Sequence, residues 1–147
     1  MKRITVLLAD DHRVMREGLR SVLSSEGDIE VVGEAENGRQ AVTLTRKLRP
    51  DVVVMDIAMP LLNGSEATRQ IRKLVPTTKV LILSAHTDAQ SVDNAIAQGA
   101  AGYLIKQCSA DFLSQAIREA QKGKIVYSPT IAKRVKANTR YLSKVEK

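Results

Sequence analysis

The sequence predicts an α/β domain built from five βα units, (βα)5, with a doubly wound parallel five-stranded sheet. Two observations predict it. Five short apolar runs rich in β-branched residues recur about every 25 residues, and a segment with helical spacing of apolar residues follows each run. Strictly alternating strands and helices need crossover connections, which give a parallel sheet with helices on both faces. At 147 residues the chain can hold one such domain and a short appendage.

The five apolar runs differ in their pattern, and the pattern indicates where each strand lies. The run VVVM is apolar without alternation, as expected for a strand that is buried on both faces. The run IEVVGEA alternates partly and carries Glu30 and Glu34, which favours an edge of the sheet. The expected strands are Ile4–Ala9, Ile29–Ala35, Val52–Met55, Val80–Leu83 and Gly102–Ile105.

Five intervening segments place apolar residues on one face of a helix, at spacings such as i, i+4 and i+7. The last of them follows Ser109, which can cap its N-terminus, with Asp111 in the first turn. The apolar stripes are Met15, Leu19, Val22 and Leu23; Ala41, Leu44 and Leu48; Ala67, Ile71 and Leu74; Val92, Ala95 and Ile96; and Leu113, Ala116, Ile117 and Ala120.

The net charge of +7 is confined to the end of the chain. Residues 1–117 hold 14 basic and 14 acidic residues, whereas residues 118–147 hold nine basic residues against two acidic ones. Ser128 and Pro129 fit an N-cap and first helical position, opening a basic helix through about Asn138. We therefore expect a domain over residues 1–123 and a basic linker, helical in part, over residues 124–147.

The composition argues against a secreted or membrane protein. The start MKRITVLLA has the basic and apolar order of a signal peptide, but its apolar run Ile4–Ala9 is too short and leads directly into two aspartates. No later stretch is long enough to span a membrane. The single cysteine, Cys108, cannot form an internal disulfide, which fits a reducing compartment. We expect a cytoplasmic protein with no membrane contact.

Polar side chains follow four of the five expected strands. Asp10 and Asp11 follow the first strand, Asp56 the third, Ser84 the fourth and Lys106 the fifth. In an open parallel sheet, ligands bind beyond the carboxyl ends of the strands. Each residue alone has a structural alternative, such as capping a helix. Clustered carboxylates, however, cost free energy unless a cation neutralises them, and so few ligands favour Mg²⁺ over a caged Ca²⁺.

These motifs, LLADDH, VVVMDIAMPLLNGSEATRQIR, VLILSAHTD and AAGYLIK, resemble the receiver domain of two-component response regulators over residues 3 to about 122. The tail AIREAQKGKIVYSPTIAKRV resembles the NarL/FixJ (LuxR-type) subfamily. The resemblance implies a flavodoxin-like strand order, 2-1-3-4-5. It also implies that Asp56 is the phosphoacceptor, that Asp11 and the main-chain carbonyl of Ala58 bind Mg²⁺ with it, and that Asp10 acts largely through water.

The resemblance further implies that Lys106 and Ser84 contact the phosphoryl oxygens. Tyr103 is similar to the aromatic switch of the family, the alternative being a half-buried tyrosine on a strand. Many receivers have a proline in a cis bond after the lysine, whereas Gln107 stands here, so we expect a trans bond. The positions that tune dephosphorylation in the family are Ala58 and His86.

The function implied is a phosphorylation-controlled switch that accepts a phosphoryl group from a sensor histidine kinase and relays it to a transcriptional output domain. The resemblance also implies that a second copy of the chain is a partner, in a homodimer formed on phosphorylation. The motif LSKVE at residues 142–146 lies where a helix-turn-helix output domain would open. We expect DNA to be contacted only through such a domain, which residues 1–147 do not include. The alternative is a stand-alone receiver that acts through protein–protein contacts.

Two other classes fit less well. An aspartyl-phosphate phosphatase also begins with a strand that ends in Asp, but it pairs a D-x-D motif with a large cap domain, and neither is found in the sequence. A nucleic-acid-binding protein could use the basic tail. The tail offers only Tyr127 and Tyr141 for stacking, so a solvated linker is favoured.

Overall fold

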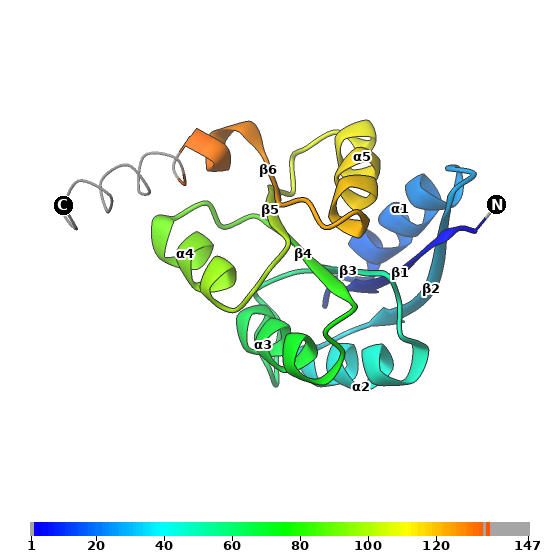
Figure 1. The fold of residues 1–147 in the computed structure, drawn as a ribbon, viewed down its shortest axis with the longest axis horizontal. Coiled ribbons are helices and arrows are strands. Elements are labelled where there is room, and N and C mark those ends of the chain that lie inside the picture. The colour runs from blue at the N-terminus through cyan, green and yellow to red at the C-terminus, as the bar shows by residue number, and fades with distance from the viewer. Residues whose placement is uncertain (1, 134, 136–147) are drawn as a thin grey trace.

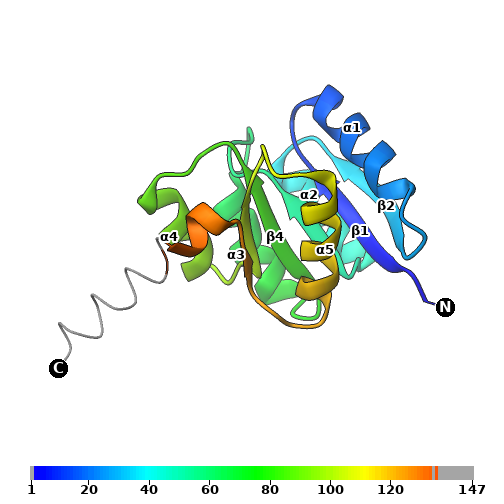
Figure 2. The same cartoon turned by 90° about the horizontal axis from the view of Figure 1, so that it is seen from above.

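A parallel sheet of six strands runs through the protein, with helices on both of its faces (Figure 1 and Figure 2). The computed structural model describes residues 2–133 and residue 135. The strand order is β2-β1-β3-β4-β5-β6. This confirms the predicted α/β fold and the order 2-1-3-4-5, with one more strand at the β5 edge.

The helices and strands alternate along the chain as predicted. Four of the five expected strands have the predicted bounds, and β4 is longer by one residue at each end. The elements are β1 (Ile4–Ala9), α1 (Arg13–Ser24), β2 (Ile29–Ala35), α2 (Gly38–Leu48), β3 (Val52–Met55), α3 (Gly64–Leu74), β4 (Lys79–Ser84), α4 (Ala89–Ala97), β5 (Gly102–Ile105), α5 (Ala110–Gln121) and β6 (Val126–Tyr127).

Two apolar cores lie on opposite faces of the sheet. Alternate residues of β3 serve the two sides: Val53 and Met55 pack with α2, α3 and α4, whereas Val52 and Val54 pack with α1 and α5. This explains why the third strand is apolar without alternation. The helix stripes are buried or half-buried except at two ends, since Leu48 and Leu74 are 39% and 45% exposed. After Leu74 the next residue, Val75, is buried in its place.

Side-chain caps fix where four helices begin. Ser109 Oγ accepts a hydrogen bond from Phe112 N at 3.1 Å, which confirms the predicted cap of α5. The same arrangement begins α2, α3 and α4, because a short polar side chain satisfies an amide that has no partner within the helix. The three residues are Asn37, Asn63 and Asp88.

The sixth strand comes from residues predicted to lie in the linker after the domain. Val126 and Tyr127 pair in parallel with Gly102 and Tyr103 of β5. A short helix then begins at Pro129, as the Ser128-Pro129 pair predicts, and residues 129–133 and 135 are helical. The rest of that predicted helix and the motif at residues 142–146 lie outside the described residues. The count of five strands was therefore one too few.

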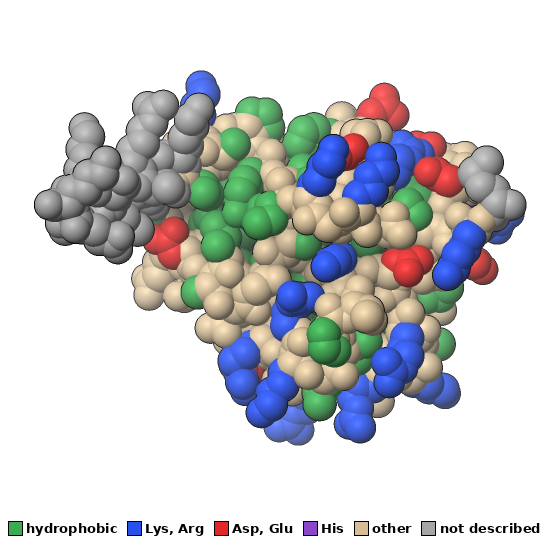
Figure 3. Space-filling view, viewed as in Figure 1, with side chains coloured by type: hydrophobic (Ala, Val, Ile, Leu, Met, Phe, Trp, Pro, Cys, Tyr) green, Lys and Arg blue, Asp and Glu red, His purple; other side chains and the backbone are tan. Residues whose placement is uncertain are grey.

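The surface of the described residues is mixed in charge. Figure 3 shows Lys and Arg side chains gathered over α2 and α3. Basic residues occupy the last turn of each of these helices, where they interact favourably with the negative end of the helix dipole. Within the described residues, none of the helices combines the length and the apolar character needed to cross a bilayer.

Candidate functional site

The carboxyl ends of three strands bring charged residues into direct contact. Asp10 follows β1, Asp56 follows β3 and Lys106 follows β5. Lys106 Nζ lies 3.0 Å from Asp10 Oδ2 and 3.2 Å from Asp56 Oδ2. Strands β1 and β3 are neighbours where the strand order reverses, which is where open α/β sheets bind ligands. The structure thus brings these three predicted residues together at one edge of the sheet.

Burial makes this cluster sensitive to charge. Asp10 and Asp56 are only 3% and 4% exposed. Burial raises the pKa of Asp56 above its ordinary value, and the negative charge of Asp10 adds to the rise, while Lys106 opposes it. Burial lowers the pKa of Lys106, but the hydrogen bond to Asp10 and the charge of Asp56 outweigh burial, so its pKa is raised. Lys106 is therefore positively charged at neutral pH.

Asp11 and His12 extend the cluster toward solvent. His12 Nδ1 lies 3.0 Å from Asp10 Oδ1 and 3.1 Å from Asp11 Oδ1. Ligand atoms of Asp10, Asp11, His12 and Asp56 all lie within 4.8 Å of one another. Three converging carboxylates suit a hard divalent cation such as Mg²⁺. His12 was missed from the sequence as a neighbour of the site, although its position directly after two aspartates was a signal.

The turn after β3 is held against the start of α3. Ala58 N donates to Asp56 Oδ1 at 3.3 Å, and Gly64 N donates to the carbonyl of Ile57 at 2.8 Å. Gly64 must be glycine for this approach, because a Cβ there would lie 2.2 Å from the main-chain oxygen of Asp56. Packing of α3 therefore fixes the backbone that carries Asp56. The ligand role of the Ala58 carbonyl stays a prediction.

Ser84 and Tyr103 meet through the backbone of His86. His86 N donates to Ser84 Oγ at 3.0 Å, and Tyr103 Oη donates to the carbonyl of His86 at 2.6 Å. Both side chains are fully buried, and burial raises the pKa of Tyr103. Tyr103 thus lies inside the protein, whereas a half-buried tyrosine was the structural alternative. The link through His86 could not be predicted from strand ends.

Arg16 also lies near the site, and no pattern in the sequence points to it. It lies on α1, and its Nη1 donates to the main-chain carbonyl of Asp10 at 2.6 Å.

The peptide bond that follows Lys106 is trans, as expected from Gln107, and no cis bond occurs in the described residues.

Comparisons with known proteins agree with this fold. A family model for the response regulator receiver domain matches residues 6–118. The transcriptional regulatory protein DegU of Brevibacillus brevis is 41% identical over 129 residues, covering 88% of this chain and 55% of DegU. The response regulator protein VraR of Staphylococcus aureus is 39% identical over 128 residues, covering 87% of this chain and 61% of VraR. The chain thus spans little more than half the length of these curated relatives.

A solved structure is similar over nearly the whole of both chains. The two-component response regulator of the LuxR family from Aurantimonas sp. SI85-9A1 has a TM-score of 0.88 and 35% identity, covering 95% of this chain and 99% of that chain. The resemblance read from the strand-end motifs is therefore confirmed. The chain belongs to the response regulator receiver domain family of two-component systems and is similar to its LuxR-family members.

Proposed function

We propose that this protein is a signalling switch that accepts a phosphoryl group on Asp56 from a sensor histidine kinase. The observation that carries the proposal is the pair of buried carboxylates, Asp10 and Asp56, that share one ammonium group at the strand ends. A carboxylate at this place can act as a nucleophile and form an acyl phosphate. The remaining groups supply charge and orientation, which is most of what phosphoryl transfer requires.

The proposed phosphoryl transfer is a nucleophilic displacement at phosphorus. A carboxylate oxygen of Asp56 forms the new P–O bond as the P–N bond to the phosphohistidine of the kinase breaks, and the imidazole nitrogen keeps the electron pair and takes a proton. Lys106 then contacts the phosphoryl oxygens as a point charge. Ser84 donates to them once its Oγ turns from the amide of His86, the hydrogen bond that it now accepts.

The residues present fit Mg²⁺, which would be held by the carboxylates of Asp10, Asp11 and Asp56 and by the main-chain carbonyl of Ala58. When bound, Mg²⁺ neutralises charge on the phosphoryl oxygens. The fit rests on the donor set: three carboxylates lie within 4.8 Å of one another, and Lys106 is the cation that touches two of them. Asp10, whose Oδ1 contacts His12 Nδ1, would contribute to holding the ion largely through water.

The output follows from the link between Ser84 and Tyr103. Movement of Ser84 toward the phosphoryl group releases the amide of His86, whose carbonyl holds the Tyr103 hydroxyl. This biases the surface around α4 and β5 between two states. We propose that this surface serves homodimer formation and a transcriptional output domain, that DNA is contacted only through that domain, and that the protein works in the cytoplasm.

Labelling by a small phosphodonor tests the chemistry. Acetyl phosphate with Mg²⁺ should add one phosphoryl group to the wild-type protein, read by intact-mass spectrometry. Asp56→Ala should abolish the label, because the nucleophile is gone. Asp93→Asn is the matched control, since Asp93 is an exposed aspartate on α4, and it should label normally.

The same experiment separates a switch from a phosphatase. A switch retains the label after the donor is removed for far longer than one turnover, whereas an aspartyl-phosphate phosphatase consumes donor continuously. Persistent labelling of the Asp56→Ala protein would show that the assignment of the phosphoacceptor is wrong.

A further inference from the structure

Arg16 is buried beside the acidic cluster, although arginine is rarely buried without a partner. Among the described residues, the buried charged side chains are Asp10, Asp56 and Arg16, at 3%, 4% and 7% exposure. Two of these three lie in the proposed phosphoryl-transfer site. The position of the third needs an explanation, because taking a guanidinium out of water destabilises the folded state unless the group is well hydrogen-bonded.

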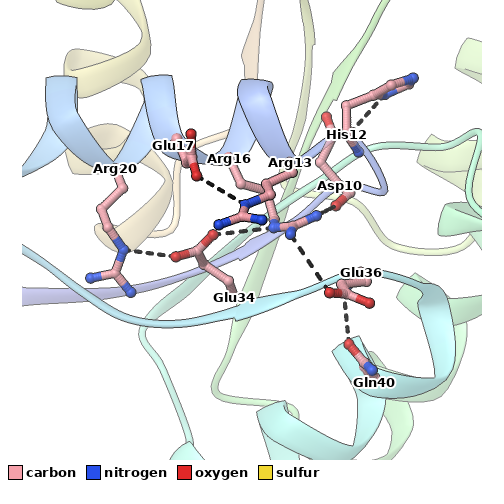
Figure 4. A network of polar contacts seen from close by, with 9 residues as sticks. All are labelled: Asp10, His12, Arg13, Arg16, Glu17, Arg20, Glu34, Glu36 and Gln40. Atoms are coloured by element: carbon pink, nitrogen blue, oxygen red, sulfur yellow. Dashed lines mark hydrogen bonds and ion pairs between the residues drawn. The ribbon is translucent and has the colours of Figure 1, made fainter.

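The contacts of Arg16 run from the end of β1 to the edge strand β2 (Figure 4). Its Nη1 donates to the main-chain oxygen of Asp10 at 2.6 Å, and its Nε donates to Glu34 Oε1 at 3.1 Å. Its Nη2 lies 3.8 Å from Glu36 Oε1. The guanidinium thus connects the backbone of Asp10 on one side with carboxylates of a neighbouring strand and loop on the other.

The carboxylate that anchors Arg16 is itself firmly held. Glu34 Oε2 accepts from Arg20 Nε at 2.8 Å, so two arginines of α1 share this carboxylate. Burial raises the pKa of Glu34, but the hydrogen bonds from Arg20 and Arg16 outweigh it, and its pKa lies below the ordinary value. Glu34 is therefore charged at neutral pH and orients the guanidinium.

Asp10 lies past the last residue of β1, at the point where the sheet stops holding the chain. Its amide still donates to the carbonyl of Ala35 on β2 at 3.1 Å. Its own carbonyl accepts from Arg16, so this bond fixes the peptide plane between Asp10 and Asp11. The direction of both carboxylates depends on that plane.

We propose that Arg16 is a positioning residue for the phosphoryl-transfer site. It holds the main chain of Asp10 so that the carboxylates of Asp10 and Asp11 converge with Asp56 on a divalent cation. The inference rests on the proposed function and adds a residue that touches neither phosphoryl group nor metal. Removing a group that hydrogen-bonds and orients a metal ligand typically weakens metal affinity about 10- to 100-fold.

The geometry requires arginine rather than any cation. The planar guanidinium donates from Nη1 and Nε in two fixed directions at once, to Asp10 and to Glu34. A lysine ammonium on its flexible stem is a point charge that does not reproduce this fork. Arg16→Lys therefore keeps the charge but loses the orientation.

The first readout is Mg²⁺ binding in the absence of a phosphodonor, measured from amide chemical shifts in NMR titrations. The second readout is labelling by acetyl phosphate. Arg16→Lys should weaken Mg²⁺ binding about tenfold and slow labelling by a similar factor. Arg13→Lys is the matched control on the same helix, since Arg13 is exposed and its Nε donates to Glu17 rather than to Glu34 or Asp10. It should stay within about twofold of wild type in both readouts.

Thermal melting separates positioning from folding. If Arg16→Lys lowers the melting temperature, Glu34→Gln gives a second measurement, because it leaves Arg16 in place and removes the charge that orients it. Glu34→Gln should weaken Mg²⁺ binding in the same direction. A merely structural Arg16 would change the melting temperature while the folded variants kept wild-type Mg²⁺ affinity.

The outcomes distinguish this inference from the proposed function. Wild-type Mg²⁺ affinity in both Arg16→Lys and Glu34→Gln, with wild-type protein labelled at Asp56, would overturn the role of Arg16 alone. Wild-type protein that neither binds Mg²⁺ nor takes the label would overturn the proposed function and this inference with it.

Discussion

Replacing Lys106 by methionine should destabilise the Mg²⁺-free protein, and the loss should depend on pH. Lys106 is the cation that contacts both buried carboxylates, at 3.0 Å and 3.2 Å. Methionine keeps much of the apolar stem but removes the charge. The two carboxylates would then face each other in the protein interior with no ammonium group between them.

The magnitude follows from the burial of the group that remains. Removing one partner of a buried ion pair costs about 3–5 kcal/mol. We take about 3 kcal/mol, because the Lys106 side chain is 14% exposed and solvent reaches the rim of the site. For a domain of this size, about 3 kcal/mol lowers the melting temperature by about 10 °C.

The sign of the pH dependence follows from Asp56. Its folded-state pKa lies above the ordinary value of 3.8, so the folded state binds this proton more tightly than the unfolded state. Stability therefore falls as pH rises through the window between those two values, and the full cost is present above it. Lys106 opposes the rise, so its removal widens the window upward. The deficit of the variant should be small near pH 4 and full at neutral pH.

Mg²⁺ should reduce the loss of stability in Lys106→Met, because the bound ion replaces the positive charge that the substitution removes. Binding at about 100 times the dissociation constant stabilises by about 2.7 kcal/mol, and the variant, with no ammonium group to compete, should bind Mg²⁺ more tightly than wild type. Urea denaturation at about pH 4.5 and about pH 7.5, with and without Mg²⁺, measures both effects.

The control is Lys122→Met, since Lys122 is 61% exposed and lies 4.0 Å from Glu119. It should change stability by less than about 0.5 kcal/mol. A deficit in Lys106→Met of equal size at both pH values, and unchanged by Mg²⁺, would refute the electrostatic reasoning and point to lost packing of the stem.

Three further predictions concern the backbone, the switch and nucleic acid. Gly64→Ala should destabilise the protein by about 2 kcal/mol or more, because the alanine Cβ would clash with the main chain of Asp56. Gly18→Ala, which has open space around it in α1, should stabilise the protein by about 0.5–1 kcal/mol. Denaturant unfolding of the two variants compares these effects. Ser84→Ala should still take the label but lack the wild-type change in NMR spectra; a full shift contradicts the coupling. Residues 1–147 should bind duplex DNA only weakly, without sequence preference and with steep salt dependence; nanomolar, selective gel shifts contradict it.

The strands and the carboxylate site could be predicted because both depend on one-dimensional patterns. A strand buried on both faces is an uninterrupted β-branched run, and Val52–Met55 has the predicted bounds. The carboxyl ends of neighbouring parallel strands meet at one edge, so the residues after them meet as well. That reasoning predicts from the sequence that Asp10, Asp56 and Lys106 lie together.

The contacts around the site could not be predicted, because they depend on how elements rotate against each other. Arg16 and Glu34 are 18 residues apart and come from different elements, so no spacing signals their bond. The sixth strand was missed for another reason. Two residues are too few to show a period, and their pairing depends on Gly102, where a Cβ would lie 2.1 Å from the carbonyl oxygen of Val126.

The two edges of the sheet are protected in different ways. Strand β2 exposes Glu30, and a charge on an edge strand discourages pairing with other molecules. Strand β5 reads GYLI and has no such charge.

Its edge is instead occupied by the chain's own continuation. Ser128 N donates to the carbonyl of Tyr103 and Ser128 Oγ accepts from Ile105 N, while Val126 N donates to the carbonyl of Ala101, just before the strand. Ile131 then closes the apolar core, with none of its surface exposed. A polypeptide cut where the family match ends, at residue 118, would leave an uncharged strand bare and prone to join its counterpart in another molecule. A form of this protein that extends to Ile131 keeps that edge paired and the core beside it covered.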